Sequence, residues 1–331
     1  MTDLSKTPFV RELASSDKKI RDKATDSLAL FLRSRTDLSL LELLKLWKGL
    51  FFCFYHSDRP LTQQALARNL SYNLVPSLPA STVHRFLRAF WITIGREFHS
   101  IDRLRLDKYL LLIRLYVGVA FQTFVKGNSN NDTNTTTTQS AVANGDNKKR
   151  KMEDSSSAKK RSKSSKKSAS KPENAQDASP DAATESSPSE GNKETNWTDL
   201  QSYIDIIAEG PLNPLNFDPS QPPADEKNGI IPMPHGPDGL RYHLLDIWID
   251  ELERVLEIDS ETGKPKGEVP IEILLAPVEK LKKEGLHKPV RMRAEETLSD
   301  ERLVQWGFRE RKVVAQESEE SEEEWGGFGD D

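Results

Sequence analysis

The sequence predicts an all-α protein: an irregular HEAT/armadillo-like helical solenoid with a long disordered insertion and an acidic tail. Three observations support this prediction. Apolar residues recur at three- and four-residue steps up to about residue 126. Residues 127–196 then contain no aromatic residue, and amphipathic patterns return after them. We expect an N-terminal solenoid (1–126), a basic, Ser-rich linker (127–196), C-terminal helices that pack back on the solenoid (197–312), and a disordered acidic tail (313–331).

The N-terminal part is expected to hold five helices, within 15–35, 36–55, 60–75, 79–98 and 101–125. Their starts carry residues suited to a first turn: Ser16 or Asp17, Asp37 or Ser39, Pro60, Ser81 and Asp102. Successive helices joined by short turns favour antiparallel hairpins. The segments 17–55 and 60–98 are therefore predicted to be two hairpins, each close to the HEAT or armadillo period. No internal self-similarity supports a strict repeat.

The stretch "LKLWKGLFFCFYHSDRPL" (44–61) is predicted to be a core helix followed by a turn. A membrane span over 38–55 is the alternative. It would bury Glu42, Lys45 and Lys48, each of which costs about 2.5–3.5 kcal/mol at a bilayer centre. We therefore expect a soluble protein. The large side chains expected in its core are Trp47, Phe51, Phe54, Trp91 and Trp248.

In the C-terminal part, a short helix begins near Trp197 and ends at Gly210 and Pro211. A strong amphipathic helix covers 240–258. A third pattern, "VPIEILLAPVEKLKKEG", is predicted to be a helix broken or kinked at Pro277. The last helix is expected in "SDERLVQWGFRERK", with Ser299 as its cap.

The net charge of −5 is the sum of two opposite blocks. The basic block has two clusters separated by a spacer, a pattern typical of nuclear import signals and of RNA-binding tethers. Its residues are Lys148, Lys149, Arg150, Lys151, Lys159, Lys160, Arg161, Lys163, Lys166 and Lys167. The acidic tail, Glu317 to Asp331, holds Ser318 and Ser321 among glutamates, where acidophilic kinases phosphorylate.

Little in the sequence favours an enzyme, and no cofactor is expected. One cysteine excludes an intrachain disulfide and a Cys-rich zinc site. Cys53 and His56 share a helix face but lack a third group, so Cys53 is expected to be a core residue. Asp246, Asp250 and Glu251, near His243, form the best carboxylate cluster for a metal-dependent ribonuclease. The other interpretation is the polar side of an amphipathic helix, which we favour.

The segment "DRLRLDK" (102–108) has two interpretations that the sequence leaves open. Its alternating charges suit a helix start with local ion pairs. They also suit a surface that contacts rRNA phosphates or an acidic partner. The residues for that second role are Arg96, Arg103, Arg105 and Lys108.

Three blocks occur in order: "LWKGLFFCFYHSDRPL", "FWITIGREFHSIDRLRLDKYLLLIR" and "LRYHLLDIWIDELERV". Together they resemble the ribosomal RNA-processing protein 1 family of eukaryotic nucleolar proteins. The matching residues are Trp47, Lys48, Gly49, Ser57, Asp58, Arg59, Pro60, Trp91, Arg96, Asp102, Arg103, Leu104, Arg105, Asp107, Lys108, His243, Asp246, Asp250 and Glu251.

The resemblance implies an α-helical, non-enzymatic assembly factor of the pre-60S particle, located in the nucleus and nucleolus. It implies a requirement in large-subunit pre-rRNA processing. The implied partners are large-subunit pre-rRNA, other pre-60S assembly factors and ribosomal proteins, with no membrane and no small-molecule substrate. Composition alone leaves a generic helical-repeat nuclear adaptor as the alternative.

Overall fold

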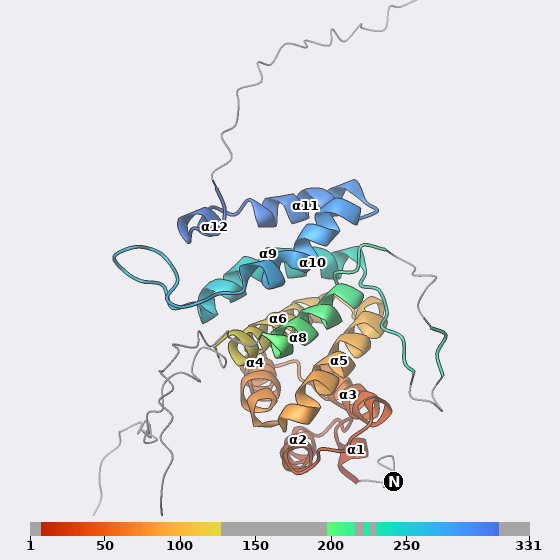
Figure 1. Cartoon of the computed structure of the whole chain (residues 1–331). Coiled ribbons are helices and arrows are strands. Elements are labelled where there is room, and N and C mark those ends of the chain that lie inside the picture. The colour runs from red at the N-terminus through yellow and green to blue at the C-terminus, as the bar shows by residue number, and fades with distance from the viewer. Residues whose placement is uncertain (1–7, 127–196, 216–221, 226–229, 311–331) are drawn as a thin grey trace, which may run out of the picture. The chain divides into compact units, whose positions relative to one another are not determined.

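The computed structural model describes residues 8–126, 197–215, 222–225 and 230–310, all of which belong to one compact unit (Figure 1). The described residues carry helices and, apart from two isolated β-bridges, no extended pairing. The predicted all-α class is therefore confirmed. The basic clusters between Lys148 and Lys167, and the tail serines Ser318 and Ser321, lie outside the described residues.

The described residues 8–126 form six α-helices and short helical turns. They are α1 (Pro8–Glu12), α2 (Lys18–Arg33), α3 (Leu40–Tyr55), α4 (Pro60–Arg68), η2 (Asn69–Asn73), η3 (Val75–Ser77), α5 (Ala80–Glu97), η4 (Phe98–Ser100), α6 (Arg103–Phe121) and η5 (Gln122–Lys126). Side-chain caps define several starts. Asp17 caps α2, Asp102 caps α6, and Ser39 forms a capping box with Glu42 on α3.

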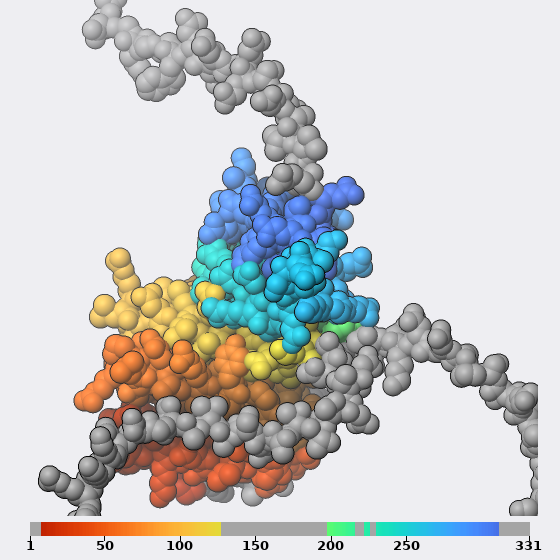
Figure 2. Space-filling model, turned by 90° about the vertical axis from the view of Figure 1, so that its left-hand side faces the viewer, coloured from red at the N-terminus to blue at the C-terminus, as the bar shows by residue number. Residues whose placement is uncertain are grey.

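The described part of the C-terminal half contains five helices: α8 (Thr198–Glu209), α9 (Asp238–Val255), α10 (Ile271–Glu284), α11 (Lys288–Leu298) and α12 (Glu301–Gln305). In Figure 2 the colours of the described chain follow one another from the N-terminal helices at one end of this unit to α11 and α12 at the other. The helices therefore stack broadly in chain order.

The predicted hairpin pairs are wrong in detail. Within the N-terminal half, α3 packs mainly on α5 and α4 mainly on α6, rather than α2 on α3 and α4 on α5 (Figure 1). The reason lies on α3: Trp47 places its ring about equally near Phe86 and Phe90 of α5, with centroids 5.1 and 5.0 Å away. Burying the aromatic stripe of α3 against α5 stabilises the fold more than packing each helix on its neighbour in sequence would.

The five large side chains expected in the core are all buried, with exposed fractions of 4% or less. Trp248 on α9 lies edge-on to Phe121 of α6, at 5.1 Å between centroids, and its indole N–H donates to the carbonyl of Leu274 at 3.1 Å. α9 therefore joins the end of α6 to α10 within one continuous core.

Helices from the two halves of the chain pack directly on each other. α9 lies along α6, and α8 contacts α5 and η5. The ring of Tyr203 on α8 stacks on Phe124 of η5, with centroids 5.6 Å apart. Two segments far apart in sequence thus share one core.

Other details also differ from expectation. α10 continues across Pro277, because Leu274, Val278 and Leu281 are fully buried around it. α1 and α11 were not predicted. Pro79 and Asp300, not Ser81 and Ser299, stand at the starts of α5 and α12.

α6 with η5 (Arg103–Lys126) is long and apolar enough to span a bilayer by composition. In the structure 72% of its most apolar window is buried by the surrounding helices. It has the position of a central core helix, and the predicted core stretch on α3 packs beside it.

Candidate functional site

The turn between α3 and α4 is fastened to the start of α6 by Arg105. Its guanidinium donates to both carboxylate oxygens of Asp58, at 3.1 and 3.0 Å, and to Asp102 at 2.6 Å. It also lies over the ring of Tyr55, 4.3 Å from the centroid. Arg105 and then Lys108 lower the pKa of Asp58 to about 2, and these carboxylates raise the pKa of Arg105. Arg105 is thus held in place by its own chain.

Lys108 is directed into the same junction. It is 4% exposed, and its ammonium donates to the carbonyls of Tyr55 and Ser57 at 2.8 and 3.1 Å, and to Asp58 at 2.8 Å. Burial lowers the pKa of this amine. A buried ammonium that already binds three oxygens cannot contact a phosphate at the surface. The prediction that Lys108 contacts rRNA or an acidic partner is therefore wrong.

Arg96 and Arg103 are different: both are exposed, and neither forms an ion pair within the described part of the chain. Arg96 is in the last turn of α5, and Arg103 is the first residue of α6. Lys45 and Lys48 of α3 are also exposed, although Lys48 pairs with Glu97. We call Lys45, Lys48, Arg96 and Arg103 the basic face.

A groove of about 300 Å³ is lined by three of these four cations, Lys45, Lys48 and Arg96; Arg103 lies outside it. Leu41, Leu44 and Ile231 line it together with these cations and with Glu97, the ion-pair partner of Lys48. The ammonium of Lys48 also lies 5.3 Å from the ring centroid of Phe52. Cations beside apolar and aromatic side chains can bind phosphates and stack unpaired bases. Sequence reasoning missed Lys45 and Lys48, although their three-residue spacing on one helix signals a shared face.

The carboxylate cluster on α9 is closed by arginines. Asp250 pairs with Arg114 and Arg302, each at 3.0 Å, and the fully buried Glu251 pairs with Arg114 and Arg254. Asp246 pairs with Arg293 at 2.6 Å. Throughout the described ranges no group of three His, Cys, Asp or Glu side chains could hold a metal ion. The carboxylates join α9 to α6, α11 and α12, as expected of a structural role.

His243 and Cys53 also serve the fold. Nε2 of His243 lies 2.9 Å from the carbonyl oxygen of Leu110, and burial lowers the pKa of its ring. Cys53 is 1% exposed, and burial raises the pKa of its thiol. Its sulfur lies 3.7 Å from Oγ1 of Thr25. A buried thiol with a raised pKa is a poor nucleophile, which agrees with its prediction as a core residue.

The fold and this surface define an all-α protein with a basic face and internally paired acidic residues. The nucleolar protein family Nop52 matches residues 4–144 and 227–327, which is more than half of the chain. The chain therefore belongs to the Nop52 family of nucleolar proteins. This confirms the predicted family and its nucleolar localisation.

Several curated relatives are similar to the chain. Ribosomal RNA processing protein 1 homolog B of Homo sapiens is 42% identical over 119 residues, covering 34% of this chain and 16% of the relative. The Mus musculus homolog B is 43% identical over 125 residues, covering 36% and 17%. Homolog A of Homo sapiens is 40% identical over 112 residues, covering 32% and 24%. The chain thus matches less than a quarter of these relatives' lengths, and their names connect the family with ribosome biogenesis.

Proposed function

We propose that this protein is a non-enzymatic assembly factor of the pre-60S particle that binds large-subunit pre-rRNA through its basic face. One observation carries the proposal: Arg96 and Arg103 are exposed cations without ion pairs in the described ranges, whereas the acidic cluster of a would-be ribonuclease is paired with arginines. The names of the relatives, which refer to ribosomal RNA processing, support the choice of RNA.

The proposal includes a division of labour along the chain. Residues 1–126 and 197–312 are proposed to form the folded body, supported by the packing of α9 on α6 and of α8 on α5. The segment 127–196 is proposed as a tether whose basic clusters direct nuclear import or add RNA affinity, supported by its composition. The tail 313–331, with Ser318 and Ser321, is proposed as a phosphorylated acidic segment.

The test begins with the tagged full chain, purified at low salt, and with sequencing of the RNA that accompanies it. Enrichment of large-subunit precursor rRNA over mature rRNA is the expected result. The recovered fragment then serves for titrations at several salt concentrations. Arg96→Glu with Arg103→Glu should weaken binding and reduce the slope of log K against log salt by roughly 1.4–1.8, since each of the two phosphate contacts contributes roughly 0.7–0.9.

Lys23→Glu with Arg68→Glu is the matched control, because both residues are exposed and lie outside the basic face on α2 and α4. It changes the net charge equally and should leave the slope within experimental error. An equal loss of RNA affinity in both double variants would show that binding depends on the net charge of the protein and not on the basic face. Cleavage of the fragment by purified protein with Mg²⁺, abolished by Asp250→Asn, would favour the ribonuclease instead.

A further inference from the structure

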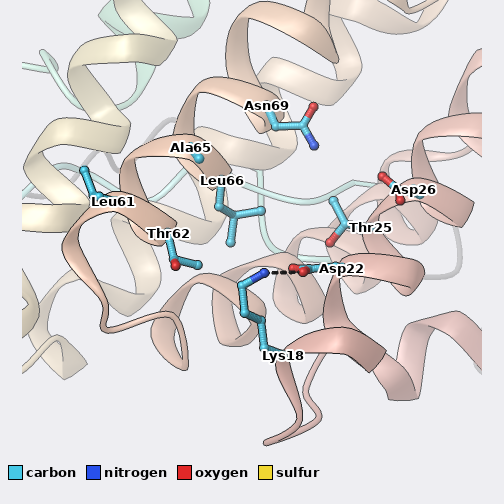
Figure 3. A pocket seen from close by; sticks show the side chains of 9 residues that line it. All are labelled: Lys18, Asp22, Thr25, Asp26, Leu61, Thr62, Ala65, Leu66 and Asn69. Carbon is cyan, nitrogen blue, oxygen red and sulfur yellow. Dashed lines mark hydrogen bonds and ion pairs between the residues drawn. The ribbon is translucent and has the colours of Figure 1, made fainter. Parts of the chain in front are cut away.

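A second groove, separate from the basic face, lies between α2 and α4 (Figure 3). It has a volume of about 500 Å³. α2 contributes Lys18, Asp22 and Asp26 to its wall, and α4 contributes Leu61, Ala65 and Leu66. Two helices thus border an open groove, with two carboxylates on the α2 wall and three apolar side chains, next to Thr62, on the α4 wall; Asn69 lies beyond the end of α4.

The α4 wall leaves apolar surface uncovered. Leu61 is 82% exposed, and Ala67 is the only residue of α4 that is buried. Leu61 and Ala65 are four residues apart, so they lie on the same side of the helix and line the groove together. A leucine this exposed, in a groove that the half-buried Leu66 also lines, offers an anchor point to an apolar side chain from another protein.

The α2 wall decides which class of partner fits. Asp22 and Asp26 are one helical turn apart, and Lys18 pairs with Asp22. Asp26 is exposed and has no ion pair in the described part of the chain. Two carboxylates against one ammonium give the groove a negative wall, which repels phosphate and attracts cationic side chains.

We propose that the α2–α4 groove binds a cationic amphipathic helix of a protein partner. The aliphatic stripe of this helix packs on Leu61, Ala65 and Leu66, and its Lys or Arg side chains pair with Asp26 and Asp22. A channel between two helices accepts a third helix through apolar anchors at i, i+3, i+4 and i+7. The protein then has a basic face for RNA and an acidic groove for a basic protein segment.

The test uses the full chain and three fluorescein-labelled peptides of about 18 residues. The first places leucines at i, i+3, i+4 and i+7 with lysines elsewhere. The second has glutamate in place of lysine, and the third scrambles the first so that no stripe remains. Fluorescence anisotropy should show the first peptide binding at least about tenfold more tightly than either of the others, because charge and stripe are both required.

Variants then locate the binding. Leu61→Ser should weaken the first peptide about tenfold, and Asp26→Asn about threefold. The controls are Leu286→Ser and Glu284→Gln, which change an exposed leucine and an exposed acidic residue in and after α10. They should leave affinity within about twofold. All four positions are exposed, so we expect each variant to fold and to melt at the temperature of wild type. Measuring the melting temperatures checks this.

Two results would overturn the proposal. Groove variants that bind like wild type, or controls that lose as much affinity, would show that the peptide adheres through general charge. Binding of a labelled RNA oligonucleotide that falls on Leu61→Ser would assign the groove to RNA. Neither result bears on the pre-rRNA titrations, which depend on Arg96 and Arg103.

Discussion

Replacing Trp47 with alanine tests the packing of α3 on α5. Trp47 is 2% exposed, its ring lies 5.0–5.3 Å from the rings of Phe86, Phe90 and Tyr116, and its indole N–H donates to the Phe86 carbonyl at 3.1 Å. A buried Trp→Ala change costs about 3–5 kcal/mol through lost transfer energy and the cavity left behind. Since three aromatic contacts and one hydrogen bond are lost together, we expect about 4–5 kcal/mol.

The assay is thermal unfolding of the full chain followed by circular dichroism. For a body of this size, 1 kcal/mol shifts the melting temperature by roughly 2–4 °C, so Trp47→Ala should lower it by roughly 8–20 °C. Trp47→Phe keeps most of the apolar contact and should cost about 1–2 kcal/mol. Leu104→Ala, at a site 94% exposed, is the control and should stay within about 0.5 kcal/mol of wild type. A Trp47→Ala melting temperature within about 2 °C of wild type would refute the packing described here.

Two further predictions concern the junctions around α6. The pKa of Asp58 is about 2 when folded, below the ordinary value of about 3.9, so its charge stabilises the fold above pH ~4 and this stabilisation is lost as pH falls towards 2. In Asp58→Asn the free energy of unfolding should no longer fall through this pH range; the difference from wild type is at most about 1 kcal/mol, because the Asp58 side chain is 55% exposed. Acid-unfolding curves that run parallel for the two proteins would contradict this. Gly118→Ala should destabilise by about 1–3 kcal/mol in urea unfolding, because the new methyl group would lie 2.5 Å from Oε2 of Glu251. Gly239→Ala meets nothing closer than 3.5 Å and is the control; equal midpoints for the two variants would argue against the close approach.

The sequence was informative where apolar periodicity is strong, and it failed where periodicity is weak or local rules are overridden. α11 was missed because Val290, Ala294 and Leu298 form a thin stripe among charged residues. Pro277 predicted a helix broken or kinked at this position; the break is wrong, because packing of the surrounding apolar residues keeps α10 continuous. Among site residues, Lys108 looked like a surface cation because its partner Asp58 is fifty positions away in sequence. Spacing along one helix cannot reveal that contact.

The three sequence blocks that match the family are joined to one another by polar contacts. Tyr55 and Asp58 of the first block bind Asp102 and Arg105 of the second. Arg114 at the end of the second block binds Asp250 and Glu251 of the third, and His243 of the third contacts the carbonyl of Leu110 in the second.

Much of the charge in these blocks therefore holds α3, α6 and α9 together. Asp58, Arg105, Lys108, Asp250 and Glu251 are all accounted for by contacts within the fold. Arg96, Arg103 and Leu104 are not: they are exposed, and Leu104 is 94% so. Exposed cations and an exposed leucine contribute little to folding, so the contacts within the fold do not explain these residues; Arg59, Leu61 and Asp107 are exposed residues of the same blocks. Reversing the charges of Arg96 and Arg103 should accordingly leave the melting temperature unchanged while weakening binding to pre-rRNA. A large loss of stability in that variant would show that Arg96 and Arg103 stabilise the fold, and it would remove the main support for the proposal that they bind pre-rRNA.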